Sequence, residues 1–187
     1  GDVTAKPVIP VFINSVAPPF SKMERVRRFG AAVGEFFAGR DEKVLFVGSG
    51  GLSHDPPVPR IATATEEQRK FLTEGRHPTA EARAERQART IATAEAFARG
   101  EADIMDLNPE WDRGFLEVCR SGDPTRFDAY DVAEMQAAAG HSVHEVRTWV
   151  AAYSALRACG EYEVSYEFYK PIKEYIAGFA VTTAVLK

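Results

Sequence analysis

A loop that regular secondary structure cannot enter constrains this chain more than any other feature. Residues 48–59 read GSGGLSHDPPVP and directly follow the apolar run at residues 43–47. The three glycines and three prolines in this stretch exclude a helix or a strand across it. The sequence therefore predicts a long loop at the carboxyl end of a strand, which is where ligands bind in open α/β sheets.

The residues before this loop indicate the fold class. A β-branched run at residues 6–13 and the run at 43–47 flank an amphipathic stretch, residues 21–38, which Gly39 ends. Two strands separated by one helix are typical of a βαβ unit and therefore of a parallel sheet. We expect an α/β fold whose sheet has helices on both faces. The length of 187 residues fits a single domain, and no repeat or linker divides the chain.

The rest of the chain is predicted to be mainly helical. The clearest helix is residues 142–159, where apolar side chains recur at helical spacing and Gly160 follows. Residues 161–168 alternate between polar and apolar side chains, as in a half-exposed strand, with Tyr162, Val164, Tyr166 and Phe168 on one side. Further helices are expected over residues 65–75 and 79–99, from Asn108 onward, and over residues 131–140.

Composition and charge exclude several classes of protein. The 23 basic and 27 acidic side chains leave a net charge of −4, so we expect no nucleic-acid partner. The longest weakly polar run, residues 176–186, is too short to span a bilayer, and the first residues do not read as a signal peptide. Cys119 and Cys159 form neither a disulfide framework nor a zinc-binding pattern, which favours a reducing cytoplasm.

Two known motifs come close to the loop but do not match it. The spacing Gly48-x-Gly50-x-x-Ser53 resembles part of a dinucleotide fingerprint. That fingerprint needs a helix amino terminus directly after the glycines, and the prolines prevent one. A hydrolase nucleophile elbow needs glycines two residues before and two residues after its serine. Asp55 occupies the second of these positions, so Ser53 is not expected to be a nucleophile.

His54 is the first candidate for chemistry. Its imidazole lies on a glycine-rich turn beyond a strand end, and an imidazole can act as a general base near neutral pH. A lone histidine is more often structural, so both interpretations stay open at this point. His77 lies in a polar turn and is expected to be solvated.

The second candidate is the cluster HSVHE at residues 141–145. The pattern Ser142-x-x-Glu145 fits a capping box, in which Glu145 would only bond the backbone N–H of the cap. Glu145 also borders the apolar stripe one turn before Trp149, and a carboxylate in a partly buried pocket favours a cation. Histidine and carboxylate ligands with open coordination positions suit non-haem Fe(II), but the chain shows no complete ligand triad.

Several longer motifs together resemble one known family. The chain is similar to the carboxyl-terminal part of the class III, LigB-type extradiol dioxygenases, and the match runs in order through nearly the whole chain. The motifs are PVIPVFIN at residues 7–14, VLFVGSGGLSH at 44–54, LNPxWD at 107–112, GxSxHExxTWVAA at 140–152, YxPI at 169–172 and IAGF at 176–179.

This resemblance implies an Fe(II) enzyme that opens a catechol ring beside its hydroxyls and inserts both atoms of O2. The implied substrate is 2,3-dihydroxyphenylpropionate or 2,3-dihydroxycinnamate, in bacterial breakdown of phenylpropanoids. His54 matches the acid/base histidine of the family, and Glu145 matches its carboxylate iron ligand. Catechol must lose protons to chelate iron, which calls for a base beside the site. One anionic ligand and two neutral imidazoles would leave positions for the catechol oxygens and O2.

The resemblance also implies a missing partner. The family's amino-terminal part supplies both iron-ligating histidines and a second acid/base histidine, and it has no counterpart in this sequence. We therefore expect residues 1–187 to be the carboxyl-terminal portion of a single catalytic domain that works with the missing amino-terminal segment. Because family members oligomerise, a homo-oligomer is expected as well.

A second function stays open from the sequence. A non-catalytic α/β module that binds an aromatic acid or a protein partner would have the same fold without the reaction. Arg147 is a weak candidate for holding the carboxylate of a substrate, because it lies across the apolar stripe from Glu145 on the predicted helix. A surface arginine that packs its stem beside apolar residues is the better interpretation. No other residue is assigned to substrate binding.

Overall fold

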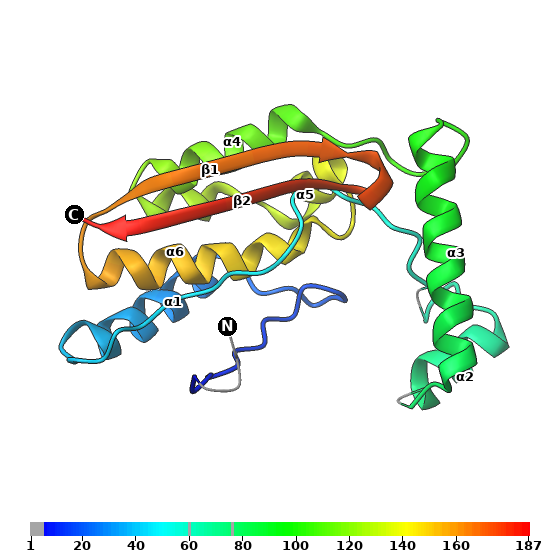
Figure 1. The fold of residues 1–187 in the computed structure, drawn as a ribbon, viewed down its shortest axis with the longest axis horizontal. Helices are drawn as coiled ribbons and strands as arrows, with labels where there is room; N and C mark the ends of the chain where they lie inside the picture. Colours follow the sequence, from blue (N-terminus) through cyan, green and yellow to red (C-terminus); the bar gives the residue numbers. More distant parts are fainter. Residues whose placement is uncertain (1–5, 60, 76) are drawn as a thin grey trace.

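The computed structural model describes residues 6–59, 61–75 and 77–187 (Figure 1). Two strands form one hairpin, and short 3₁₀ turns join some of the helices. None of the described helices is both long and apolar enough to cross a membrane. In chain order the elements are α1 (Met23–Ala38), α2 (Glu66–Glu74), α3 (Ala80–Ala98), α4 (Pro109–Arg120), η2 (Pro124–Ala129), α5 (Val132–Ala139), η3 (Val143–Val146), α6 (Arg147–Cys159), β1 (Tyr162–Ile172), η4 (Lys173–Tyr175) and β2 (Ala177–Leu186).

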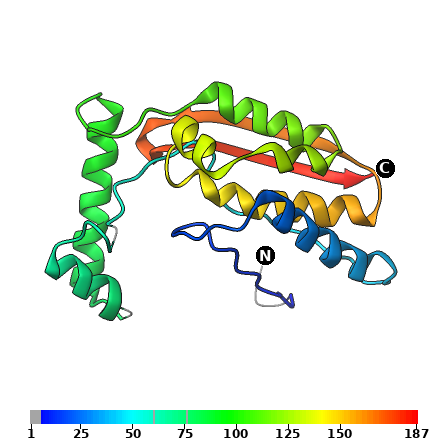
Figure 2. The same ribbon diagram turned by 180° about the vertical axis from the view of Figure 1, so that it is seen from behind.

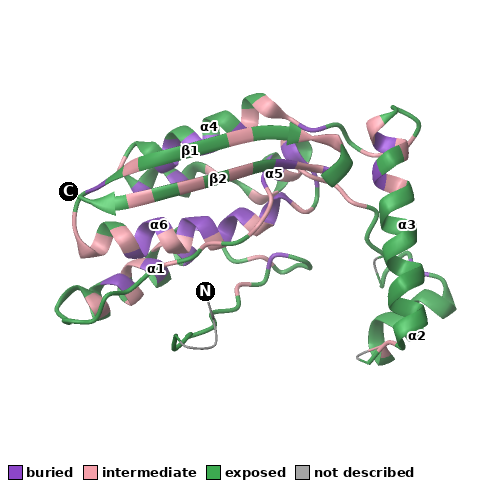
Figure 3. Ribbon diagram, viewed as in Figure 1, coloured by how far each residue is buried: buried purple, intermediate pink, exposed green. Residues whose placement is uncertain are grey.

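The helices and the hairpin form one main body with an arm at its side. Helices α2 and α3 make the arm, while α1, α4, α6 and the β1–β2 hairpin make the body (Figure 1). Seen from behind, α4 and α6 lie over the same face of the hairpin (Figure 2). Buried residues gather where these helices meet the hairpin (Figure 3), and Phe115, Leu116 and Val150 have no exposed surface. This apolar core fixes the helices on which the site is built.

The predicted helices are confirmed to within two residues at their ends, apart from residues 142–159. Local capping explains this agreement: the Asn108 side chain accepts the Trp111 N–H, and Pro109 is the first residue of α4. Thr65 forms a complete capping box with Gln68 at the start of α2. Residues 142–159 divide into the turn η3 and the helix α6, so the regular helix begins at Arg147.

Two glycines let α1 approach α6 closely. A Cβ added at Gly30 or Gly34 would overlap the backbone carbonyl groups of Ala151 and Ala155 on α6. Any side chain at these positions would push the two helices apart, because backbone atoms cannot move aside as a flexible side chain can. Helix α1 is therefore held against α6 by the absence of side chains at its contact face.

We predict that Gly34→Ala lowers the free energy of unfolding by about 1–3 kcal/mol, the usual cost of overpacking a tight contact. Gly114→Ala on α4 is the matched control, since an added Cβ there meets nothing within 4 Å. The control should be stabilised by about 0.5–1 kcal/mol, because alanine has the higher helix propensity. Urea unfolding of both variants measures the difference; equal effects would contradict the close helix contact.

The expected mixture of helices with a sheet is confirmed, but the expected parallel pairing is wrong for the described residues. Their only sheet is the antiparallel pair β1–β2. Residues 6–13 and 43–47, the predicted strands of a βαβ unit, form no strand. Their apolar side chains are largely uncovered: Phe12 is 91% exposed and Leu45 is 84% exposed. A strand needs a neighbour to pair with, and the described residues supply neither segment with one. Both segments therefore have the composition of a strand but no hydrogen-bonded partner strand among the described residues.

The predicted half-exposed strand is confirmed as β1, but its side chains do not stay on one face. The register with β2 shifts between Val164 and Tyr166, which marks a β-bulge at Ser165. An extra residue reverses the alternation beyond it. Tyr162 is buried, whereas Tyr166 and Phe168 are exposed on the other face of the hairpin. The plain alternation read from the sequence therefore holds only up to the bulge.

Candidate functional site

The glycine loop is fastened to two other parts of the fold. Leu52 N–H donates to the carbonyl of Gly178, and Gly178 N–H donates to the carbonyl of Ser53, so the loop joins the start of β2. His54 N–H donates to the carbonyl of Ala139 at the end of α5. These backbone bonds fasten residues 52–54 to the start of β2 and to the end of α5.

Side chains from the start of α6 fasten the other end of the loop. Trp149 Nε1–H donates to the carbonyl of Gly50 at 3.0 Å, and Thr148 Oγ1–H donates to the carbonyl of Ser49 at 2.8 Å. A Cβ added at Gly50 would lie 2.6 Å from the Cβ of Glu145. Glycine is therefore required at position 50 for the loop to pass over the candidate metal ligand.

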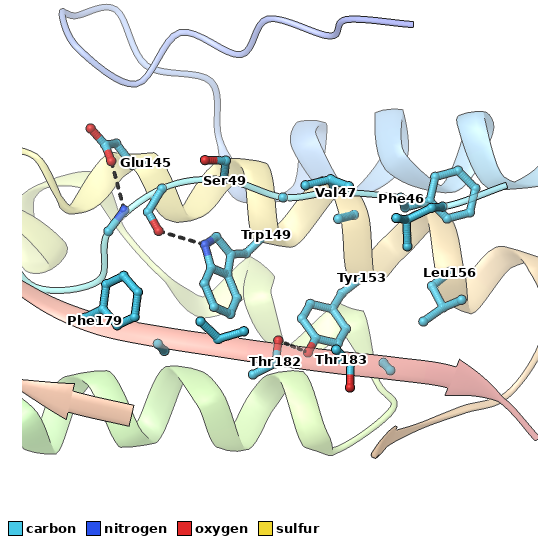
Figure 4. Close-up of a pocket in the computed structure, with 18 of the residues that line it drawn as sticks. Phe46, Val47, Ser49, Glu145, Trp149, Tyr153, Leu156, Phe179, Thr182 and Thr183 are labelled. Atoms are coloured by element: carbon cyan, nitrogen blue, oxygen red, sulfur yellow. Dashed lines mark hydrogen bonds between the residues drawn. The ribbon is translucent and has the colours of Figure 1, made fainter. Parts of the chain in front are cut away.

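Glu145 and His54 are brought together by this packing. Glu145 Oε2 accepts the Gly51 N–H at 2.9 Å and lies 3.6 Å from His54 Nε2 (Figure 4 shows the Glu145 contact with the loop). The Glu145 side chain is 40% exposed, whereas that of His54 is 10% exposed. The capping-box interpretation of Glu145 is wrong, because its carboxylate bonds the loop and Ser142 makes no side-chain cap.

The hydrogen bonds of His54 fix its neutral tautomer. Nδ1 lies 2.8 Å from the carbonyl oxygen of Leu52, which can only accept, so Nδ1 carries the proton. The lone pair of the neutral ring is then on Nε2, which faces Glu145. A ring held in this way can take a second proton at Nε2 without turning. The ring therefore has a free basic nitrogen, which a general base requires.

The electrostatics of the pair favour an anionic Glu145. The interaction with His54 and the bond from the Gly51 N–H lower the pKa of Glu145 against the opposing effect of burial. Burial lowers the pKa of His54, but the interaction with Glu145, the Leu52 carbonyl and the charge of Asp112 outweigh it and raise this pKa. The site thus holds a carboxylate beside an imidazole of increased basicity.

Ser53 is part of a buried network around Asp112. Asp112 has no exposed surface and accepts three hydrogen bonds, from Ser53 N–H at 2.7 Å, Ser53 Oγ–H at 2.8 Å and Tyr169 OH at 2.8 Å. Ser53 Oγ in turn accepts the Asn108 N–H at 3.0 Å. The Ser53 hydroxyl therefore both donates and accepts a hydrogen bond within this buried network.

Sequence reasoning gave Asp112 no role, although a signal was present. Phe115, Leu116 and Cys119, at helical spacing from Asp112, are all buried, so the carboxylate lies on the apolar face of α4. Burial raises the pKa of Asp112, and the bonds from Tyr169 and Ser53 oppose that rise. An acidic residue on the apolar side of a helix needs donors from elsewhere in the fold. Here those donors are the loop and β1.

We predict that Asp112→Asn lowers the free energy of unfolding by about 1–3 kcal/mol, because an amide cannot accept all three buried bonds. The exposed Asp103→Asn is the control and should change the stability by less than about 0.5 kcal/mol. Thermal and urea unfolding measure the effect. A variant as stable as the control would show that Asp112 does not hold the loop.

His144 and Arg147 form a buried pair behind the site. Arg147 Nη1 lies 2.6 Å from His144 Nδ1, and Arg147 Nε–H donates to the carbonyl of Ser21. The guanidinium also lies over the ring of Phe20. Arg147 has no exposed surface. The expectation of a surface arginine is therefore wrong: the guanidinium is buried against Ser21, His144 and Phe20.

Burial and the charge of Arg147 lower the pKa of His144 to about 4, so this histidine is neutral when folded at pH 7. Its ordinary pKa is near 6.5, so the stability it contributes is complete above that value and is lost as the pH falls towards 4. We predict that His144→Gln reduces the loss of unfolding free energy between pH 7 and pH 4 by about 2–3 kcal/mol. The exposed His77→Gln is the control and should match the unsubstituted chain in urea unfolding at both pH values. If both variants and the unsubstituted chain lost the same unfolding free energy between pH 7 and pH 4, the prediction would be contradicted.

The remaining candidates lie outside this arrangement. His141 Nδ1 pairs with Asp55 at 3.0 Å on the surface, where the pair ties the loop to the turn after α5. His77 is exposed, as expected. Across the described ranges no cluster of three histidine, cysteine, aspartate or glutamate side chains is placed to hold a metal ion. The described part of the site thus offers one carboxylate and one imidazole.

Residues 3–181 match the family described as the catalytic LigB subunit of aromatic ring-opening dioxygenase. The chain belongs to this family. The resemblance expected from the motifs is thereby confirmed, and with it the expected LigB-type fold of mixed helices and strands.

Curated relatives share long stretches of identical sequence with the chain. It is 73% identical over its whole length to the "2,3-dihydroxyphenylpropionate/2,3-dihydroxicinnamic acid 1,2-dioxygenase" of Rhodococcus rhodochrous. Proteins of the same name from Rhodococcus globerulus and, with the suffix 1, from Dechloromonas aromatica are 71% and 50% identical over the whole chain. The chain spans 59% to 60% of the length of these relatives.

Proposed function

We propose that this chain supplies the carboxylate iron ligand and an acid/base histidine to an Fe(II)-dependent extradiol dioxygenase. The proposed reaction opens the ring of 2,3-dihydroxyphenylpropionate or 2,3-dihydroxycinnamate, and both atoms of O2 enter the product. The observation that carries the proposal is the position of His54 Nε2, 3.6 Å from Glu145 Oε2, on a ring whose other nitrogen donates to Leu52. The names of the longer relatives support the substrate class.

The donor chemistry of Glu145 fits the proposed metal. Its carboxylate is a hard oxygen ligand, its pKa is lowered, and part of its surface is exposed, all of which suit a divalent iron with open positions. The described residues do not complete a three-ligand site, so the other ligands in this proposal come from outside them. Bound Fe(II) would supply the redox chemistry with O2.

His54 would handle the protons of the catechol. A substrate hydroxyl beside Nε2 would transfer its proton to the lone pair there, giving an imidazolium and a catecholate oxygen. The Leu52 carbonyl already accepts from Nδ1, and the Glu145 carboxylate lies beside Nε2, so both stabilise the positive ring. The same nitrogen would return the proton when the ring-opened product forms. The low exposure of the His54 side chain, 10%, limits competition from water.

The setting of this site is proposed from the same family resemblance. Residues 1–187 would form the carboxyl-terminal portion of one catalytic domain, completed by an amino-terminal segment of the kind that the longer relatives contain. We further propose that the enzyme is a cytoplasmic homo-oligomer. The two cysteines, Cys119 and Cys159, are free thiols, which suits a reducing compartment.

We predict that His54→Gln lowers kcat by about 10²–10⁴-fold, the usual contribution of a general base. The assay uses a longer chain, in which residues 1–187 are joined to the part of the Rhodococcus rhodochrous relative that they do not match. It follows the yellow ring-opened product and O2 consumption with Fe(II) present. The control His141→Gln should keep most of the activity, since His141 is exposed and bonds Asp55. If the joined chain without any substitution bound the catechol but consumed no O2, the result would instead favour a non-catalytic module.

We also predict that Glu145→Gln removes iron and activity together. An amide is neutral and a weaker ligand than a carboxylate, so the joined chain should lose about 10-fold or more of its iron affinity. Iron content after gel filtration measures this loss, and His54→Gln should keep its iron. Unchanged iron content in Glu145→Gln would contradict the proposed ligand role.

A further inference from the structure

A trough crosses the main body between residues 44–51 and β2. Its volume is about 690 Å³, and it is partly open to solvent. Trp149, Ala152, Tyr153 and Leu156 of α6 form its floor, and residues 177–184 form the wall opposite residues 44–51 (Figure 4). Glu145 lies at one end of the trough. A helix thus forms the floor, and extended chain forms both walls.

Each wall has a backbone edge without a partner. Strand β2 pairs only with β1 in the described part of the chain, so its edge along the trough carries no ladder. Residues 44–48 make no backbone–backbone hydrogen bond to any other described residue. Free strand edges are templates for pairing with another extended segment. The trough therefore lies between two such edges.

Apolar side chains line much of the trough, and several of those on its walls are exposed. Leu45, Val47 and Val181 line it, although large apolar side chains are normally covered in a folded domain. The α6 floor adds Trp149 and Leu156. A segment that fits this surface must offer backbone hydrogen bonds on two sides and apolar side chains towards α6. A β-strand meets both requirements, whereas a helix cannot form the lateral bonds.

The directions of the walls are compatible with one inserted strand. In Figure 4 the chain runs from Phe46 to Ser49 in the direction opposite to the run from Phe179 to Thr183. A strand between them would be parallel to one wall and antiparallel to the other. Both arrangements form ladders in mixed sheets. Insertion would join residues 44–48 and the β1–β2 hairpin into one continuous sheet over α6.

We propose that this trough is the docking site for a β-strand from the part of the family's polypeptide that the chain does not contain. The relatives are longer by about two fifths of their length, so they have ample chain to supply a strand. A strand tethered in the same polypeptide has a high effective concentration and outcompetes the same surface on a second copy. The proposal does not depend on the reaction proposed above.

Backbone amide hydrogen exchange tests the docking. We expect the trough-facing amides of residues 44–48, and those amides of residues 179–183 that point into the trough and not to β1, to exchange at least about 10-fold more slowly in the joined chain than in residues 1–187 alone. The amides that pair β1 with β2 serve as the internal reference, because they are bonded in both proteins. Protection of both walls is required. Protection of one wall alone, or of neither, overturns the proposal.

A matched pair of variants locates the strand in the trough. Leu45→Asp places a charge on an exposed wall residue and should return both walls to fast exchange in the joined chain. Ile91→Asp changes an exposed residue on α3, away from the trough, and should leave the protection in place. Both variants of residues 1–187 alone should keep the parent circular dichroism. Equal protection in the two joined variants overturns the proposal.

Co-expression as two separate polypeptides gives a second measurement. Tagged residues 1–187 should retain the untagged remainder, and Leu45→Asp should reduce the retained amount at least about 10-fold. If residues 1–187 alone become protected along both walls as their concentration rises, a second copy fills the trough and the proposal is overturned.

Discussion

Asp112 carries a buried negative group that the loop and β1 must satisfy together. Its two oxygens accept bonds from the N–H and the hydroxyl of Ser53 and from the hydroxyl of Tyr169. An unsatisfied buried carboxylate is costly, so α4, the loop and the hairpin must meet in one arrangement to satisfy it. Leu52 and His54 lie on either side of Ser53, and this constraint therefore fixes the carbonyl that orients the imidazole. The geometry of the candidate site depends on a residue that takes no part in the proposed chemistry.

Local signals in the sequence predicted the helices well. The caps at Thr65, Thr79 and Asn108, and the glycines that follow α1 and α6, lie within a few residues of the bonds they make. The parallel sheet failed because pairing depends on a neighbour, and composition cannot show whether that neighbour is present. The bulge at Ser165 could not be predicted from the sequence either, since it depends on the register with β2.

The sequence predicted only part of the candidate site, again because local signals can be read from it and distant packing cannot. The glycines and prolines around His54 identified the loop, and the family motifs identified Glu145. The pattern Ser142-x-x-Glu145 also suggested a cap, and the bond from the Gly51 N–H to the Glu145 carboxylate rules out that cap. Asp112 and Arg147 were missed or misplaced because their burial depends on packing against distant segments. Spacing along one helix does not reveal such packing.

The bond between Gly51 and Glu145 joins residues 94 positions apart, and the bonds from Ser53 to Asp112 join residues 59 apart. Contacts this distant in sequence close large loops, whose entropy cost delays them relative to local helix formation. During folding, His54 and Glu145 therefore come together only after the helices that carry their neighbours have packed. A metal ion that met the chain earlier would find isolated side chains and weak affinity, so loading of the proposed iron site would require the finished fold.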